Sequence, residues 1–282
     1  MTVTRQTNDI DDQSALLHGW NQSYAQLSRG AFAGSLTEAT IGSAYLFREV
    51  TSQSLFQSGY VGPDHLAVGV PAPMQGASRF CGQRCDGGQI HLFSGREGFD
   101  FHTPTGLDMI GVVIPRALVG VAPVQPRLLT SPSAPALRDL MATLIAASDG
   151  PMQAAMLGDL VEALKDILAE GETPEPRRPD ALARIRDLVE SRSEGDEPPD
   201  VEEMCAAAAM SRRSLQNLFS AELGMRPSHY VRALRLNAAR KRIRSGGSVT
   251  EAATAFGFWH FGRFAQDYRL QFGELPSQTR AN

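Results

Sequence analysis

The sequence has few cysteines and no long hydrophobic run. Three cysteines among 282 residues are too few, and odd in number, for a disulfide scaffold. No uninterrupted apolar stretch approaches the roughly 18 residues that a membrane-spanning helix needs, so we expect no such helix and no membrane partner. Residues 1–13 are polar and contain no apolar core of signal-peptide length, which predicts a cytoplasmic protein.

Catalytic and metal-binding motifs are also missing. The chain contains no G-x-S-x-G elbow, no phosphate-binding G-x-x-x-x-G-K-[ST] loop, no G-x-G-x-x-G fingerprint and no H-E-x-x-H pair. His91 and His102 lack the further nearby ligands of a metal site, and we interpret them as structural. Cys81 and Cys85 lack a second ligand pair for zinc, which leaves ordinary thiols or, alternatively, a redox switch. We therefore predict no enzyme, no catalytic residue, no cofactor and no metal.

Length and composition indicate a folded protein of about two domains. Hydrophobic residues make up 42% and charged residues 21%, which argues against a disordered chain. The net charge of −4 is unevenly distributed: residues 1–174 carry 10 Lys+Arg against 17 Asp+Glu, and residues 204–282 carry 12 against 4, a net charge of +8. Such a basic block is typical of a nucleic-acid-binding domain, although Arg-rich helices can also be merely solvated.

The sequence predicts mainly β-strands from about residue 35 to residue 125. Short apolar or alternating stretches are separated by clusters of Gly, Pro, Ser and Asp, a pattern that predicts a sandwich or barrel. Pro115 ends the last of these stretches, because proline cannot continue a central strand. The expected strands are residues 44–50, 65–70, 89–93 and 109–114.

The hydrophobic period changes from about residue 134 to residue 170. Two apolar stripes with helical spacing, one around Leu137–Ile145 and one around Leu157–Leu168, flank a break at residues 149–151. We expect an αα-hairpin that packs on the β region. The alternative is that one stripe also forms a dimer seam.

A Pro-rich stretch, GETPEPRRPD at residues 171–180, predicts an exposed linker. The expected organisation is a sensor domain over residues 1–130, a helical hairpin over 131–171, a linker over 172–180 and a C-terminal helical domain over 181–282.

Residues 201–223 have the pattern of a helix-turn-helix. A short helix over residues 201–208 precedes a turn at Ala209-Met210, and Ser211 stands where an N-cap is expected. Leu215 and Phe219 would face inward on the next helix, which Gly224 ends. The outward side carries forked donors and acceptors of the kind that read guanine and adenine edges. These outward residues are Arg212, Arg213, Gln216, Asn217 and Ser220.

The pattern recurs about 48 residues later. Ser248 is expected to cap a short helix, Gly257-Phe258 to form the turn, and residues 260–271 to form the second helix. Its outward side holds His260, Arg263, Gln266 and Arg269. A helix over about 227–244 joins the two units and carries six basic side chains, including Arg242, which we expect to neutralise phosphates.

With these two units, the stretch from Met204 to Ser277 resembles the DNA-binding domain of the AraC/XylS family of transcriptional regulators. The signatures are SRRSLQNLF at 211–219, RLNAAR at 235–240 and GFWHFGRFAQDYRLQFG at 257–273, followed by Pro276-Ser277. The second unit, with Trp259-His260 and GELPS at 273–277, is most similar to the branch that contains ethanolamine-operon regulators.

The resemblance implies two recognition helices in adjacent major-groove segments of promoter DNA. The family's base-reading positions fall on Arg213, Gln216 and Asn217 in the first helix. In the second they fall on Phe261, Gly262 and Gln266, with Arg263 beside them. Phe261 and Gly262 cannot hydrogen-bond base edges through their side chains, so the second unit would mainly grip phosphates through Arg263, Arg269 and its helix N-terminus. Ala209 replaces a frequent Gly and would be strained if the turn requires positive φ.

For the N-terminal half the resemblance rests on the order of elements. The family often places a cupin-like β-barrel, which takes a small effector, and a dimerising helical hairpin before the DNA-binding domain. The implied fold is an α+β multidomain protein, and the implied function is a DNA-binding activator that is controlled by a small effector and contacts RNA polymerase. The dimerising hairpin of the family implies a homodimer. The alternatives are an N-terminal domain that only dimerises or contacts a partner protein and, less favoured, a catalytic cupin domain.

Overall fold

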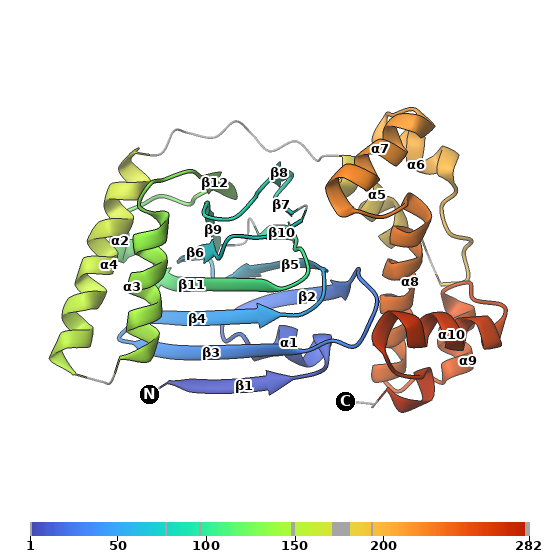
Figure 1. Ribbon diagram of the computed structural model, residues 1–282, viewed down its shortest axis with the longest axis horizontal. Helices are drawn as coiled ribbons and strands as arrows, with labels where there is room; N and C mark the ends of the chain where they lie inside the picture. Colours follow the sequence, from blue (N-terminus) through green and yellow to red (C-terminus); the bar gives the residue numbers. More distant parts are fainter. Residues whose placement is uncertain are drawn as a thin grey trace. The chain divides into compact units, whose positions relative to one another are not determined.

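The computed structural model of the protein describes residues 2–76, 78–95, 98–147, 150–170, 181–192 and 194–279 (Figure 1). The chain divides into two compact units. Unit 1 contains residues 1–24, 33–52 and 56–176, and unit 2 contains residues 25–32, 53–55 and 177–282. The expected linker 172–180 lies outside the described residues, and so does Asp149 of the expected break between the two hairpin helices.

In the part of the chain that the structure describes, twelve strands form two antiparallel sheets. The seven-stranded sheet has the order β1-β3-β4-β11-β6-β9-β12, and the five-stranded sheet has the order β2-β5-β10-β7-β8. Neither sheet closes on itself among the described residues, so the expected cupin-like barrel is not confirmed beyond a sheet-rich domain. The strands are β1 (Val3–Thr7), β2 (Trp20–Gln26), β3 (Gly34–Ile41), β4 (Ala44–Thr51), β5 (Leu55–Val61), β6 (His65–Pro71), β7 (Arg79–Phe80), β8 (Gln83–Arg84), β9 (Ile90–Ser94), β10 (Phe99–His102), β11 (Leu107–Pro115) and β12 (Arg127–Leu129).

The four strands expected from the sequence are confirmed as β4, β6, β9 and β11, all in the larger sheet. These strands are buried and rich in Val, Leu and Ile, which is why their apolar runs were visible. β11 ends at Pro115, as expected. The sequence did not single out the other eight strands found in the described residues: β1, β2, β3, β5, β7, β8, β10 and β12.

The seven-stranded sheet carries a different core on each face. An aliphatic core joins one face to α3 (Ala134–Ala146) and α4 (Pro151–Glu170), the expected hairpin, through residues such as Leu46, Met141 and Leu164 (Figure 1). A second core, rich in phenylalanine, includes residues of both sheets. The apolar stripes of α3 and α4 thus pack on the sheet, as expected. Two shorter helices, α1 (Ile10–Leu16) and α2 (Arg116–Val119), complete unit 1.

Unit 2 is helical. Its elements are α5 (Ala181–Glu190), α6 (Val201–Ala208), α7 (Arg212–Leu223), α8 (Pro227–Arg244), α9 (Val249–Ala255), α10 (Phe261–Phe272) and a 3-10 turn, η2 (Pro276–Gln278). The expected boundaries are confirmed to within one or two residues, since caps mark them: Asp200 and Ser248 form capping boxes, and Ser211 accepts a hydrogen bond from the Ser214 amide.

The turn of the first helix pair contains a left-handed alanine. Ala209 has φ 53° and ψ 45°, a region that costs an L-residue about 1–2 kcal/mol. In the second pair the left-handed turn residue is Gly257, with φ 68°. The strain expected at Ala209 is therefore present in the structure.

We predict that Ala209→Gly raises the free energy of unfolding of unit 2 by about 0.5–1 kcal/mol, because relief of the left-handed strain exceeds the added entropy of glycine in the unfolded chain. Urea unfolding monitored by far-UV circular dichroism measures the change. Ala206→Gly is the matched control, since Ala206 is an exposed helical residue of α6, and this change should cost about 0.5–1 kcal/mol. If both changes destabilise alike, Ala209 is not strained.

Candidate nucleic-acid interface

The first recognition helix, α7, is fixed on its inner side and open on its outer side. Leu215 and Phe219 are fully buried, and the Phe219 ring meets the Tyr230 ring of α8 edge-on, with centroids 5.3 Å apart. The outer residues of α7 are free to meet a ligand, because the fold uses none of their side chains to fill its core. The expected contact residues Ser211, Arg212, Arg213, Gln216 and Asn217 are all exposed.

One of these residues has an acidic neighbour. The Arg212 guanidinium lies 3.8 Å from the Glu202 carboxylate, and both side chains are largely exposed. An ion pair in this setting is weak, so a phosphate could replace the carboxylate. Arg213, Gln216 and Asn217 are exposed donors and acceptors on the same helix.

The second recognition helix, α10, has the same organisation. Phe264 and Tyr268 are buried in a core with Phe258, while the expected contact residues His260, Phe261, Gly262, Arg263, Gln266 and Arg269 are exposed. His260 is the N-cap, and α10 begins at Phe261 rather than at the expected residue 260. Two large apolar side chains, Trp259 and Phe261, are 61% and 49% exposed at this helix start. The exposure of Phe261 fits contact with an apolar group such as a thymine methyl.

Helix α8 differs from the expectation of a basic surface. Arg240 and Arg244 are buried, and Arg240 pairs with Glu274 and lies 5.2 Å from the centre of the Phe272 ring. Arg232 pairs with Asp267 of α10. Burial lowers the pKa of Arg235, and the neighbouring Arg232 adds to this effect. Most of these basic side chains therefore stabilise the domain rather than face solvent. The sequence did not predict this, because helical periodicity alone cannot tell a buried arginine from an exposed one.

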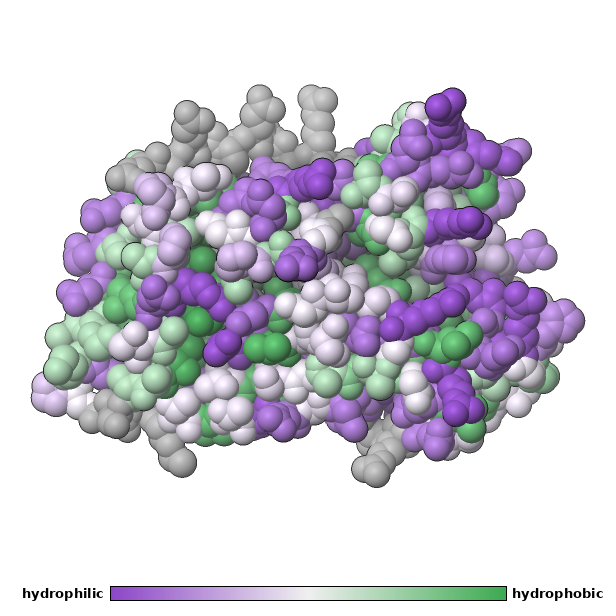
Figure 2. Space-filling model, in the orientation of Figure 1, coloured by the Kyte–Doolittle hydropathy of each residue, from purple (hydrophilic) through white to green (hydrophobic). Residues whose placement is uncertain are grey.

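Two basic residues of α8 remain exposed, Lys241 and Arg242. The Arg242 guanidinium lies 3.2 Å from the Glu194 carboxylate, with about half of each side chain exposed. Arg242 thus keeps the position that a phosphate contact requires. Figure 2 shows hydrophilic side chains gathered over the helices of unit 2 on the face drawn.

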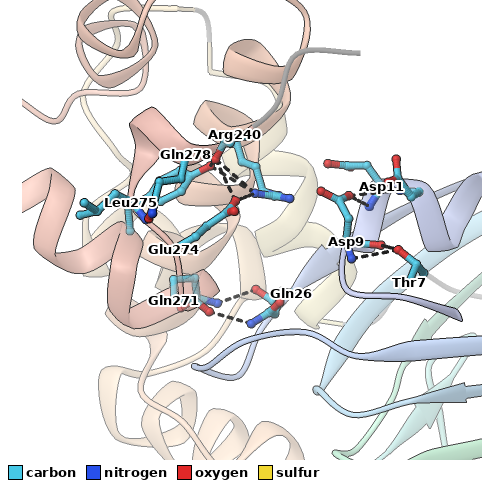
Figure 3. A network of polar contacts seen from close by, with 12 residues as sticks. Thr7, Asp9, Asp11, Gln26, Arg240, Gln271, Glu274, Leu275 and Gln278 are labelled. Carbon is cyan, nitrogen blue, oxygen red and sulfur yellow. Dashed lines mark hydrogen bonds and ion pairs between the residues drawn. The ribbon is translucent and has the colours of Figure 1, made fainter.

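A segment from the N-terminal part of the chain belongs to unit 2 and is held by buried amides. The Gln26 amide nitrogen donates to Asn237 Oδ1 at 2.8 Å, and Asn237 Nδ2 donates to the Gln26 carbonyl at 2.9 Å. Gln26 and Gln271 exchange two further bonds through their side chains, at 2.6 and 2.8 Å (Figure 3). Sequence reasoning missed this contact, because 211 residues separate Gln26 from Asn237.

Within the described ranges, no group of three or more His, Cys, Asp or Glu residues is placed to hold a metal ion. Cys81 and Cys85 are buried, and neither forms a disulfide bond. Burial raises the pKa of the Cys85 thiol to about 11, so it is protonated at neutral pH and a poor nucleophile. No helix of the part described is long and apolar enough to cross a membrane.

Comparison with known proteins supports the helix-turn-helix interpretation. Residues 204–282 match a family model described as a helix-turn-helix domain. An XylDLEGF operon transcriptional activator of Pseudomonas putida is 45% identical over 83 residues, which are 28% of this chain and 25% of that protein. A probable thc operon regulatory protein of Rhodococcus erythropolis is 31% identical over 178 residues, 61% of this chain and 51% of that protein. The chain thus spans between a quarter and a half of the length of these relatives.

Among solved structures, the AraC-like transcriptional activator CuxR is similar over 90% of this chain and all of its own, with 16% identity and a TM-score of 0.46. The two curated relatives are named as a transcriptional activator and an operon regulator, not as enzymes. Neither is named as an ethanolamine-operon regulator, so that finer placement stays a prediction. Over residues 204–282, the chain carries the helix-turn-helix domain of the AraC/XylS family of transcriptional regulators.

Proposed function

We propose that this protein is a sequence-specific transcriptional activator that binds double-stranded promoter DNA through unit 2 and is controlled by a small effector in its N-terminal domain. The observation that carries the proposal is the pair of helix-turn-helix units, whose outer faces on α7 and α10 are exposed while their inner faces are buried. Such a protein acts in the cytoplasm, beside DNA, and has no catalytic role.

Base reading is assigned to α7 and phosphate binding to both helices. Arg213, Gln216 and Asn217 present forked groups that suit purine edges, whereas Phe261 and Gly262 at the start of α10 do not. Arg263 and Arg269, with Gln266 between them, line the exposed side of α10. The second unit therefore adds affinity and register, and the first supplies most of the sequence preference.

Three partners follow from the same proposal. An activator contacts RNA polymerase, and the exposed Trp259 is an apolar candidate for a protein contact. The hairpin of α3 and α4 is the proposed dimerisation element over residues 131–171, with the sensor domain over 1–130, the linker over 172–180 and the DNA-binding domain over 181–282. The effector belongs to the two-sheet domain, whose aromatic core contains a cavity.

Gln216→Ala tests base reading. On a duplex selected by the protein from a random library, we expect the change to weaken binding by about 1–3 kcal/mol, since a bidentate contact to a purine is lost. On a scrambled duplex of equal length and charge we expect little change. Fluorescence anisotropy titrations measure both affinities. Equal losses on the two duplexes would remove Gln216 from base reading.

Arg242→Ala and Arg240→Ala separate phosphate contact from domain stability. Arg242→Ala should weaken binding to all sequences alike and reduce the salt slope of log K by about one, because one phosphate contact is lost. Arg240→Ala should instead lower the free energy of unfolding by about 2 kcal/mol, since it removes a buried partner of Glu274. Anisotropy at several salt concentrations and urea unfolding measure the two effects. An unchanged salt slope for Arg242→Ala would contradict its assignment.

A further inference from the structure

The aromatic core of unit 1 encloses a cavity of about 50 Å³. Strands of both sheets line it: β4, β6, β9 and β11 of the larger sheet, and β2, β5, β7 and β10 of the smaller one. Well-packed cores have few voids larger than a water molecule, and this void holds more than one. The void is lined by side chains of both sheets, mostly apolar and aromatic with a few polar groups, which is the kind of lining that ligand pockets have.

Aromatic rings form much of the cavity wall. The Trp20 ring meets the rings of Phe47, Phe93 and Phe99 edge-on, with centroids 5.5–5.8 Å apart. The Trp20 Nε1–H, although buried, has no hydrogen-bond partner. Buried indole N–H groups usually find one, so this donor is available to a bound molecule.

His91 is the second unsatisfied group of the wall. Its side chain is 97% buried, since only 3% of the residue is exposed, and neither ring nitrogen has a hydrogen-bond partner. The ring instead packs against Phe80 and Phe101, with centroids 4.5 and 4.9 Å away. Burial lowers the pKa of His91 to about 3, so the imidazole is neutral and offers one donor and one acceptor. The sequence interpretation of His91 as structural did not foresee two free nitrogens.

Charge selects the class of ligand. Among the described residues, no Lys or Arg lines the cavity, so an anion would find no counter-charge from them. The acidic residue Glu49 of the described lining accepts hydrogen bonds from the Tyr24 hydroxyl at 2.8 Å and from Gln13 Nε2 at 3.0 Å. Both donors bind the Oε1 atom of Glu49, and burial raises the pKa of this carboxyl group. Glu49 is therefore already committed within the fold and is a weak counter-charge for a cation. An uncharged molecule meets neither penalty.

We propose that this cavity is the effector site and that it binds a compact, uncharged, apolar molecule carrying one hydrogen-bonding group, such as an alcohol or amide, which His91 and Trp20 recognise. This inference rests on the proposed function, because only a transcriptional regulator would use the bound molecule as an effector. The cavity is about a third of the roughly 150 Å³ that holds benzene, so the ligand is branched and small or displaces a flexible side chain. Met109, which lines the cavity, is the adaptable one.

The test uses the full chain with Trp259→Phe, which leaves Trp20 as the sole tryptophan. Isobutanol and isobutyramide are the uncharged probes, and isobutyrate and isobutylammonium are charged probes of the same carbon skeleton. We expect saturable changes in Trp20 fluorescence with the uncharged probes, at concentrations at least tenfold lower than with either charged probe. A non-saturating change common to all four, or tighter binding of a charged probe, would overturn the proposal.

His91→Phe is the decisive variant, with His65→Phe, a histidine of β6 outside the cavity lining, as its control. His91→Phe should abolish saturation and leave the protein as stable as before or more so, because an unpartnered polar ring is replaced by an apolar one. His65→Phe should respond like the parent. If His91→Phe does not fold, Trp20→Phe provides an independent test, with binding measured as the rise in the thermal unfolding temperature that each probe causes. We expect Trp20→Phe to reduce this probe-induced stabilisation severalfold. An unaffected response in these variants contradicts the assignment.

Sequence-specific DNA binding is measured on the same samples. Saturable probe binding without any change in affinity for the selected duplex would refute effector control but uphold the cavity's ligand class. Specific DNA binding without probe saturation would refute the cavity proposal and leave the DNA-binding function in place.

Discussion

The packing of α8 between the two helix-turn-helix units is the constraint on which unit 2 depends. Tyr230, Leu236 and Ala239 of this helix are almost fully buried. On one side Tyr230 meets Phe219 of α7, and on the other Arg232 pairs with Asp267 of α10. Because both recognition helices are anchored to the same rigid element, their exposed faces are held in a fixed relation, and two weak DNA contacts can act as one strong site.

The same logic explains why α8 is rich in arginine without being a simple basic surface. A helix that is buried on most sides needs long side chains that can cover apolar rings while their charged ends reach a partner. Arg232 and Arg235 lie 5.7 and 5.6 Å from the Phe258 ring, and Arg240 lies over Phe272. The proposed DNA contacts thus fall on exposed residues that the core does not use, on α7 and α10 and at Arg242.

The two cores of unit 1 differ in composition. The aliphatic core between the larger sheet and the α3–α4 hairpin consists mainly of Leu, Ile and Val side chains. The aromatic core contains the cavity and the unpartnered ring nitrogens of His91 and Trp20, and a buried polar group without a hydrogen bond costs stability. Strand β2 joins this core to unit 2 along the chain: Trp20 and Tyr24 line the cavity, and Gln26 ends the strand.

Much of unit 2 could be predicted from sequence, because its helix ends are marked by local chemistry: Ser211 and Ser248 as caps, Gly224 and Gly273 as left-handed ends. The outward residues of α7 and α10 followed from helical spacing. What the spacing could not show depends on distant partners: the burial of Arg240, the bonds between Gln26 and Asn237, and the missing partners of His91. In unit 1 the apolar strands β4, β6, β9 and β11 were visible, whereas β3 and β5, which mix polar residues and glycine with apolar ones, were not. Two-residue strands such as β7 and the half-exposed β1 carry no periodicity that separates them from loops.

The most direct test of the account is the affinity of the full chain for a duplex selected from a random library against a scrambled duplex of equal length, by fluorescence anisotropy at near-physiological salt. Base reading by α7 predicts a preference of roughly 10³-fold or more. Equal binding to both duplexes that collapses as salt rises would mean attraction to phosphates alone, and it would contradict the claim that this domain reads sequence.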